Sequence, residues 1–214
     1  MKYLKMLALT AVAAGALMAF IGAGTASATV LCSTTVTPCP AGQDLTAGTV
    51  LDFSIPAGTS ALLVDTGGEE LDKCPASTVK GTISDTGGKE KTVTGHVQEL
   101  TWSPKCTFPT QTLKAGKLEI HQIAGTSNGL VTSDATEGLF EVTINTIFFG
   151  SCIYGVTGGT TIGELTEGNP AVFHANAIAE KFSGSNLACP ATSKWTATYT
   201  LTEPKETTVS VKPE

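Results

Sequence analysis

Apolar and polar residues alternate along most of the chain with the period of two that is typical of β-strands. In residues 194–201, Trp, Ala, Tyr and Leu fall on one face, and Lys and Thr fall on the other. β-Branched threonine suits such an outer face, because it packs well on a pleated surface and loses rotamer freedom in a helix. The alternation predicts strands at 50–55, 61–65, 78–84, 92–102, 112–123, 129–132, 140–145, 153–156, 160–165, 194–201 and 208–211.

Two segments depart from simple alternation. Within 92–102 the apolar face changes between Val97 and Leu100, which predicts a β-bulge. In 169–184, an Asn-Pro start and a glycine end are compatible with a helix. In the same segment Ala and Phe alternate with Val, His, Asn and Ile, and the neighbours on both sides are strands, so the strand is favoured.

Turn-forming residues between the strands indicate the fold class. Paired glycines at 67–68, 87–88 and 158–159 supply the backbone angles that tight hairpins need. No change of composition marks a boundary within 29–214. We therefore expect 29–214 to form an all-β, single-domain, disulfide-bonded antiparallel β-sandwich.

The first 28 residues have the three parts of a secretory signal peptide. Residues 1–5 are basic, residues 6–21 are uncharged and apolar, and small residues occupy positions 26 and 28. The apolar run is glycine-broken and shorter than the about 20 residues of a membrane span. Cys32 lacks the leucine three positions earlier that lipidation requires. We expect cleavage after Ala28 and a secreted, extracellular protein with no membrane span.

All six cysteines follow the signal segment, and an even number of cysteines in a secreted chain indicates disulfides. No C-x-x-C is present, which removes the usual spacing of redox and zinc sites. Sequence alone allows many connectivities, but consecutive strands usually neighbour each other in space. We therefore expect sequential bridges, which are Cys32–Cys39, Cys74–Cys106 and Cys152–Cys189.

Composition narrows the classes of function. All 13 basic residues are lysine, and the formal net charge is -6. Nucleic-acid binding is disfavoured, because both a basic footprint and arginine are missing. The 41% hydrophobic content argues against intrinsic disorder, and the threonine and glycine content argues against a coiled coil.

The sequence Asp-Thr-Gly occurs at 65–67 and again at 85–87. An apolar run that leads into this motif resembles the active-site loop of aspartic proteases, in which two carboxylates share a proton. The two copies lie close together in the chain, and each is followed by glycine, unlike the family pattern. Hairpin turns explain both copies better. Asp65 is the candidate catalytic residue if the protein is a secreted hydrolase.

Two further groups of residues have the chemistry of metal ligands. The acidic stretch 65–72 offers carboxylates for calcium, but its spacing does not match an EF-hand loop, so a solvated turn is favoured. The histidines are His96, His121 and His174, and nothing in the sequence places them together. We assign no catalytic, metal or cofactor-binding residue.

Three stretches of the chain resemble uncharacterised secreted Thr/Gly-rich β proteins of actinobacteria. They are LKAGKLEIH at 113–121 followed by AGT at 124–126, FGSCIYG at 149–155, and KFSGS at 181–185 followed by CP at 189–190. The resemblance implies secretion and β architecture, and it assigns no functional residue. The sequence as a whole predicts an extracellular structural or binding module for surface adhesion or matrix contact, with an unknown extracellular or cell-surface partner.

Overall fold

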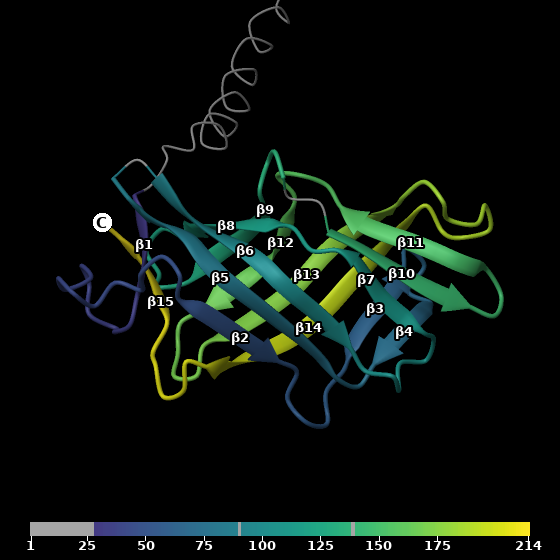
Figure 1. The fold of residues 1–214 in the computed structure, drawn as a ribbon, viewed down its shortest axis with the longest axis horizontal. Helices are drawn as coiled ribbons and strands as arrows, with labels where there is room; N and C mark the ends of the chain where they lie inside the picture. Colours follow the sequence, from purple (N-terminus) through teal and green to yellow (C-terminus); the bar gives the residue numbers. More distant parts are fainter. Residues whose placement is uncertain (1–27, 90, 138–139) are drawn as a thin grey trace, which may run out of the picture.

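The computed structural model describes residues 28–89, 91–137 and 140–214. These residues form a 15-stranded sheet system without a helix (Figure 1). The strands are β1 (Thr29–Cys32), β2 (Val50–Ser54), β3 (Ala61–Asp65), β4 (Glu70–Cys74), β5 (Ser77–Gly88), β6 (Lys91–Trp102), β7 (Thr110–Lys114), β8 (Lys117–Gln122), β9 (Gly129–Ser133), β10 (Phe140–Thr146), β11 (Gly150–Val156), β12 (Thr161–Thr166), β13 (Val172–Lys181), β14 (Thr192–Glu203) and β15 (Ser210–Pro213). The all-β prediction is confirmed. The predicted signal segment, up to residue 27, lies outside the described residues.

Eight strands close into an antiparallel barrel, so the predicted β-sandwich is wrong. Their order is β14-β2-β5-β6-β8-β9-β12-β13, and the ladder between β13 and β14 closes the ring. Closure gives every one of these strands two partners, whereas a sandwich leaves open edges. Glycine permits the close approach of β12 to β13, because a Cβ on Gly163 would collide with the carbonyl oxygen of His174.

The β13–β14 hairpin continues past the barrel and carries a second group of strands. β14 also pairs with β3, which pairs with β4, and β13 pairs with β11, which is followed by β10 and β7. Within the described chain no ladder joins the outer strands β4 and β7. The Cys74–Cys106 disulfide bridges this gap, and the Thr107 N–H donates to the Lys73 carbonyl at 2.9 Å. We call the gap the β4–β7 seam.

The first and last strands of the described chain pair with each other. β1 and β15 run antiparallel from Thr29↔Pro213 to Cys32↔Ser210, and β1 also pairs with the end of β5. Leu31 and Val211 bury their side chains in the same hydrophobic cluster as the barrel. We call β1 with β15 the terminal clasp.

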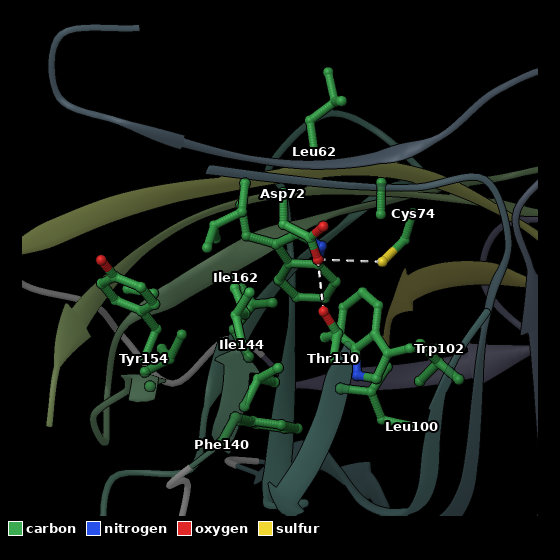
Figure 2. A pocket seen from close by; sticks show the side chains of 18 of the residues that line it. Leu62, Asp72, Cys74, Leu100, Trp102, Thr110, Phe140, Ile144, Tyr154 and Ile162 are labelled. Carbon is green, nitrogen blue, oxygen red and sulfur yellow. Dashed lines mark hydrogen bonds between the residues drawn. The ribbon is translucent and has the colours of Figure 1, made fainter. Parts of the chain in front are cut away.

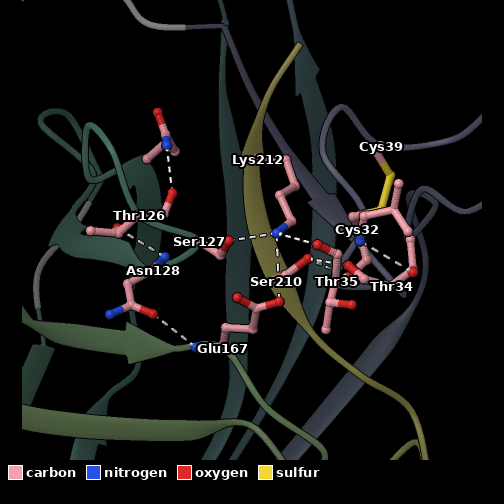
Figure 3. Close-up of polar contacts among 12 residues, drawn as sticks. Cys32, Thr34, Thr35, Cys39, Thr126, Ser127, Asn128, Glu167, Ser210 and Lys212 are labelled. Atoms are coloured by element: carbon pink, nitrogen blue, oxygen red, sulfur yellow. Dashed lines mark hydrogen bonds and ion pairs between the residues drawn. A yellow bond between two sulfur atoms is a disulfide. The ribbon is translucent and has the colours of Figure 1, made fainter.

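A buried lysine holds the terminal clasp to neighbouring loops. Lys212 is 1% exposed, and its ammonium donates to the Thr35 carbonyl at 3.0 Å and to Ser127 Oγ at 2.5 Å (Figure 3). The Glu167 carboxylate lies 3.5 Å away. A charge is tolerated inside a protein when it is paired and hydrogen-bonded in this way.

Most of the predicted strands are observed, but the single strand predicted at 112–123 is divided into β7 and β8, and β1 and β4 were not predicted. Segment 169–184 contains β13, in which the alanines at 175, 177 and 179 are buried while the alternate residues are exposed. A register shift between Lys80 and Gly81 lies opposite the segment between Val97 and Leu100, which confirms the predicted bulge. The three disulfides join the pairs predicted from chain order.

Candidate functional site

The inward faces of the strands leave a cavity of about 90 Å³ beside the β4–β7 seam, which we call the seam cavity (Figure 2). Strands of the barrel and strands of the outer group both contribute to its wall. Apolar and aromatic side chains dominate the lining, among them Leu63, Val97, Leu100, Trp102, Phe140, Ile144, Tyr154, Ile162, Phe173 and Trp195. Such a lining binds apolar groups and excludes ions.

A second cavity of about 80 Å³ lies within the barrel, and we call it the barrel cavity. Its wall comes from β2, β5, β6, β8, β9, β12 and β13 and is again mainly apolar. Four side chains line both cavities, which are therefore neighbours: Val79, Val97, Leu118 and Phe173. The interior is therefore a row of two apolar chambers rather than a fully packed core.

Asp72 is the charged side chain in the wall of the seam cavity. It is 3% exposed, and one of its oxygens accepts hydrogen bonds from the Lys73 N–H at 2.9 Å and the Phe108 N–H at 3.1 Å. The other oxygen accepts from Thr110 Oγ1 at 2.6 Å (Figure 2). Cys74 Sγ lies 3.5 Å from that oxygen, but it is bonded to Cys106 and carries no proton to donate. The carboxylate thus joins the two sides of the β4–β7 seam.

Aromatic residues give the seam cavity a rigid floor. The ring of Trp195 packs edge-on against Trp102 and Tyr199, with centroids 6.3 and 6.1 Å apart. Trp102 Nε1 donates to Thr112 Oγ1 at 3.0 Å, whereas the buried Trp195 Nε1 has no partner among the described residues. A ligand atom that accepts a hydrogen bond would satisfy this N–H.

The tyrosines near the cavities are held in their neutral form. Burial, with a smaller contribution from the charge of Asp65, raises the pKa of Tyr154 to about 12. Burial also raises the pKa of Tyr199. Tyr154 donates to the Pro190 carbonyl at 3.2 Å, and Tyr199 Oη lies 3.0 Å from Ser77 Oγ. Both phenols are therefore hydrogen-bonding groups at neutral pH.

The two Asp-Thr-Gly motifs are not brought together as a protease pair. Asp65 ends β3, and its carboxylate accepts a hydrogen bond from the Glu69 N–H at 2.8 Å in its own turn. Asp85 lies in β5 and accepts from the Gly87 N–H at 3.0 Å. No hydrogen bond in the described part of the chain links the two carboxylates. Each aspartate stabilises local backbone, as turn chemistry predicts.

The candidate metal ligands are likewise dispersed. Within 65–72, Asp72 points inward while Glu69 and Glu70 are exposed, so these carboxylates do not converge on one ion. In the described residues the one close group of three potential ligands is Asp72, Cys74 and Cys106, and its two sulfurs form a disulfide. His96, His121 and His174 occupy different strands, and His121 pairs with Glu119 at 3.2 Å.

Sequence reasoning missed the cavities. Period-two alternation correctly marks Trp195, Tyr199 and Phe173 as inward-facing, but an inward position reads as core whether or not its neighbours fill the space. The local pattern cannot predict the cavities, because their volume depends on how the side chains of many strands pack together.

Comparisons with known proteins give no relative from which a function could be transferred. A scan of protein-family models, a search of curated proteins and a search of solved structures each find no match. No helix in the described ranges has the length and hydrophobicity that crossing a bilayer requires.

Proposed function

We propose that the protein is an extracellular binding module that takes a small apolar molecule into its barrel. The observation that carries the proposal is the pair of neighbouring apolar cavities, one within the closed barrel and one between the barrel and the outer strands. Eight-stranded barrels lie at the size where the interior either fills with side chains or keeps room for one small ligand. The three disulfides support an oxidising location outside the cell. A role in surface adhesion or matrix contact stays a prediction.

The shape of the interior favours a narrow ligand. Each cavity is smaller than the about 150 Å³ cavity that holds benzene in an engineered protein, but together the two exceed that volume. Movement of Phe173, which lines both cavities, would connect them. An unbranched alkyl chain is slim enough to extend through both chambers, and it matches their apolar lining.

Calorimetric titration of the disulfide-bonded protein with decanol, an alkyl chain that ends in one hydroxyl group, tests this function. We expect saturable binding with one site per chain. Ala179 is buried in the wall of the seam cavity, so Ala179→Leu fills part of the space and should weaken binding at least about tenfold. Ile178 is on the same strand but 53% exposed, so Ile178→Leu is the matched control and should bind normally.

The proposal fails if decanol does not bind to the native protein. It also fails if Ala179→Leu and Ile178→Leu bind equally well while both keep the thermal stability of the unsubstituted protein.

A further inference from the structure

Three large apolar side chains project from one end of the molecule. Ile147 and Phe148, in the turn between β10 and β11, are 84% and 80% exposed. Leu187, in the loop between β13 and β14, is 94% exposed. Figure 1 shows this turn and this loop at the same end of the molecule, opposite the terminal clasp. We call Ile147, Phe148 and Leu187 the apolar tip.

The two loops that carry the apolar tip are fastened to each other. The Cys152–Cys189 disulfide joins β11 to the loop that contains Leu187. Next to the disulfide, the Asn186 N–H donates to the Ser151 carbonyl at 2.9 Å, and the Ile153 N–H donates to Ser185 Oγ at 2.8 Å. These contacts keep the loop beside the hairpin, so the apolar side chains are held out in solvent by an ordered framework.

The surroundings of the apolar tip are free of acidic and basic side chains over long stretches of sequence. Residues 142–163 contain no Asp, Glu or Lys, and residues 182–193 contain none either. Lys181 borders the second stretch, and its ammonium donates to the carbonyls of Leu187 and Cys189 at 3.4 and 3.0 Å. In a chain with a net charge of -6, the two stretches that carry the apolar tip are therefore uncharged, whereas the acidic turn that follows β3 lies beside the start of β14, where Asp65 pairs with Ser193.

We infer that the apolar tip docks the protein on a lipid surface with electrically neutral headgroups. Exposed apolar side chains on a fixed framework mark an interaction site, and bulky aliphatic and aromatic side chains are those that enter the interface of a bilayer. A stable protein partner needs about 800 Å² on each side, contributed by roughly 20–30 residues. The three projecting side chains of the apolar tip offer a much smaller contact area. A negatively charged leaflet would repel a chain of charge -6, so neutral lipid is the better match.

Docking at this end would also orient the seam cavity. β10 and β11 carry the turn that holds Ile147 and Phe148, and they also contribute Phe140, Ile144 and Tyr154 to the cavity wall. The cavity side of the molecule would then face the lipid. The docking inference nevertheless rests on the surface alone and does not require the cavity to be filled.

Flotation of the disulfide-bonded protein with phosphatidylcholine vesicles tests the docking. We expect the protein to float with the vesicles, and we expect added salt to leave binding unchanged, because no charge pairing is involved. The double variant Phe148→Ser/Leu187→Ser should lower partitioning about tenfold or more. Val36 is 54% exposed and lies in the loop closed by Cys32–Cys39, so Val36→Ser is a control for loss of exposed apolar surface.

Three results would overturn the inference. The first is that the native protein does not bind to the vesicles, and the second is that Val36→Ser reduces flotation as strongly as the double variant. The third is a native protein that sediments as a dimer and becomes monomeric in Phe148→Ser/Leu187→Ser, which would assign the apolar tip to self-association. Thermal melting of each variant shows that the fold is kept, because exposed tips contribute little to stability.

Discussion

Asp72 shows how one buried carboxylate takes the place of a strand ladder. Its oxygens accept hydrogen bonds from donors on both sides of the β4–β7 seam, and Thr110, one of those donors, lies 38 residues further along the chain. Without the carboxylate, the Lys73 and Phe108 N–H groups would lose their acceptor next to an apolar cavity. From the sequence, Asp72 reads as part of a solvated acidic turn, because spacing within 65–72 reveals nothing of a partner so distant.

Substitution of Asp72 tests this bridging role. Asp72→Ala should lower the free energy of unfolding by about 2–4 kcal/mol, because buried donors are left without an acceptor. Asp72→Asn should cost about 1 kcal/mol, since its carbonyl oxygen still accepts from the N–H groups. Urea unfolding monitored by tryptophan fluorescence measures both. Glu70→Ala, an exposed change on the same strand, should stay within about 0.5 kcal/mol. Equal values for Asp72→Ala and Glu70→Ala would show that the carboxylate bridges nothing.

At the scale of elements, the local pattern predicted most of the strands, although it merged β7 with β8 and missed β1 and β4, and it could not predict which strands pair. Alternation placed Trp195, Ala197 and Tyr199 on one face of β14, and it identified β13 in an ambiguous segment, because period two is a property of neighbouring residues. Which strands pair is set by contacts far apart in sequence. The ladder of β14 with β2, which completes the barrel, and the seam that lacks a ladder both depend on such contacts. The expected sandwich was wrong for this reason.

The β4–β7 seam should open when its disulfide is removed. Cys74→Ala/Cys106→Ala deletes a crosslink across 32 residues and should lower the free energy of unfolding by about 2–4 kcal/mol. Because the seam has no ladder, amide hydrogen exchange should accelerate most in β4 and β7, with β13 remaining protected. Cys32→Ala/Cys39→Ala, which removes a crosslink across 7 residues, should leave exchange in β4 and β7 unchanged. Uniform acceleration across all strands in the Cys74/Cys106 variant would contradict a local seam.

At the scale of the whole molecule, closure of the eight-stranded barrel explains both the stability of its wall and the space that remains inside it. Each barrel strand is paired on two sides, and the wall is set by strand number and tilt rather than by the interior side chains. Small inward residues such as Ala61 and Ala179 then leave room that larger neighbours do not fill. The candidate site is thus a consequence of the assembled barrel, and residue-level patterns in the sequence could identify its wall but not its cavities.

The terminal clasp extends this closure to the two ends of the described chain, and Lys212 provides its test. β1 and β15 bury Leu31 and Val211 in the hydrophobic cluster of the barrel, so the clasp should open only with the whole fold. Lys212→Met keeps the apolar stem but leaves the Thr35 carbonyl, Ser127 Oγ and Glu167 without the ammonium, and should lower the free energy of unfolding by about 1–3 kcal/mol. Lys114→Met, on the exposed strand β7, is the control and should change the free energy of unfolding by no more than about 0.5 kcal/mol.

Amide hydrogen exchange provides a second test of the clasp. In Lys212→Met, the exchange rates of the Leu31 and Val211 amides should rise by the same factor as those of β13, since these amides all report global unfolding. If β1 and β15 exchanged much faster than β13 in the unsubstituted protein, the clasp would be a locally fraying end.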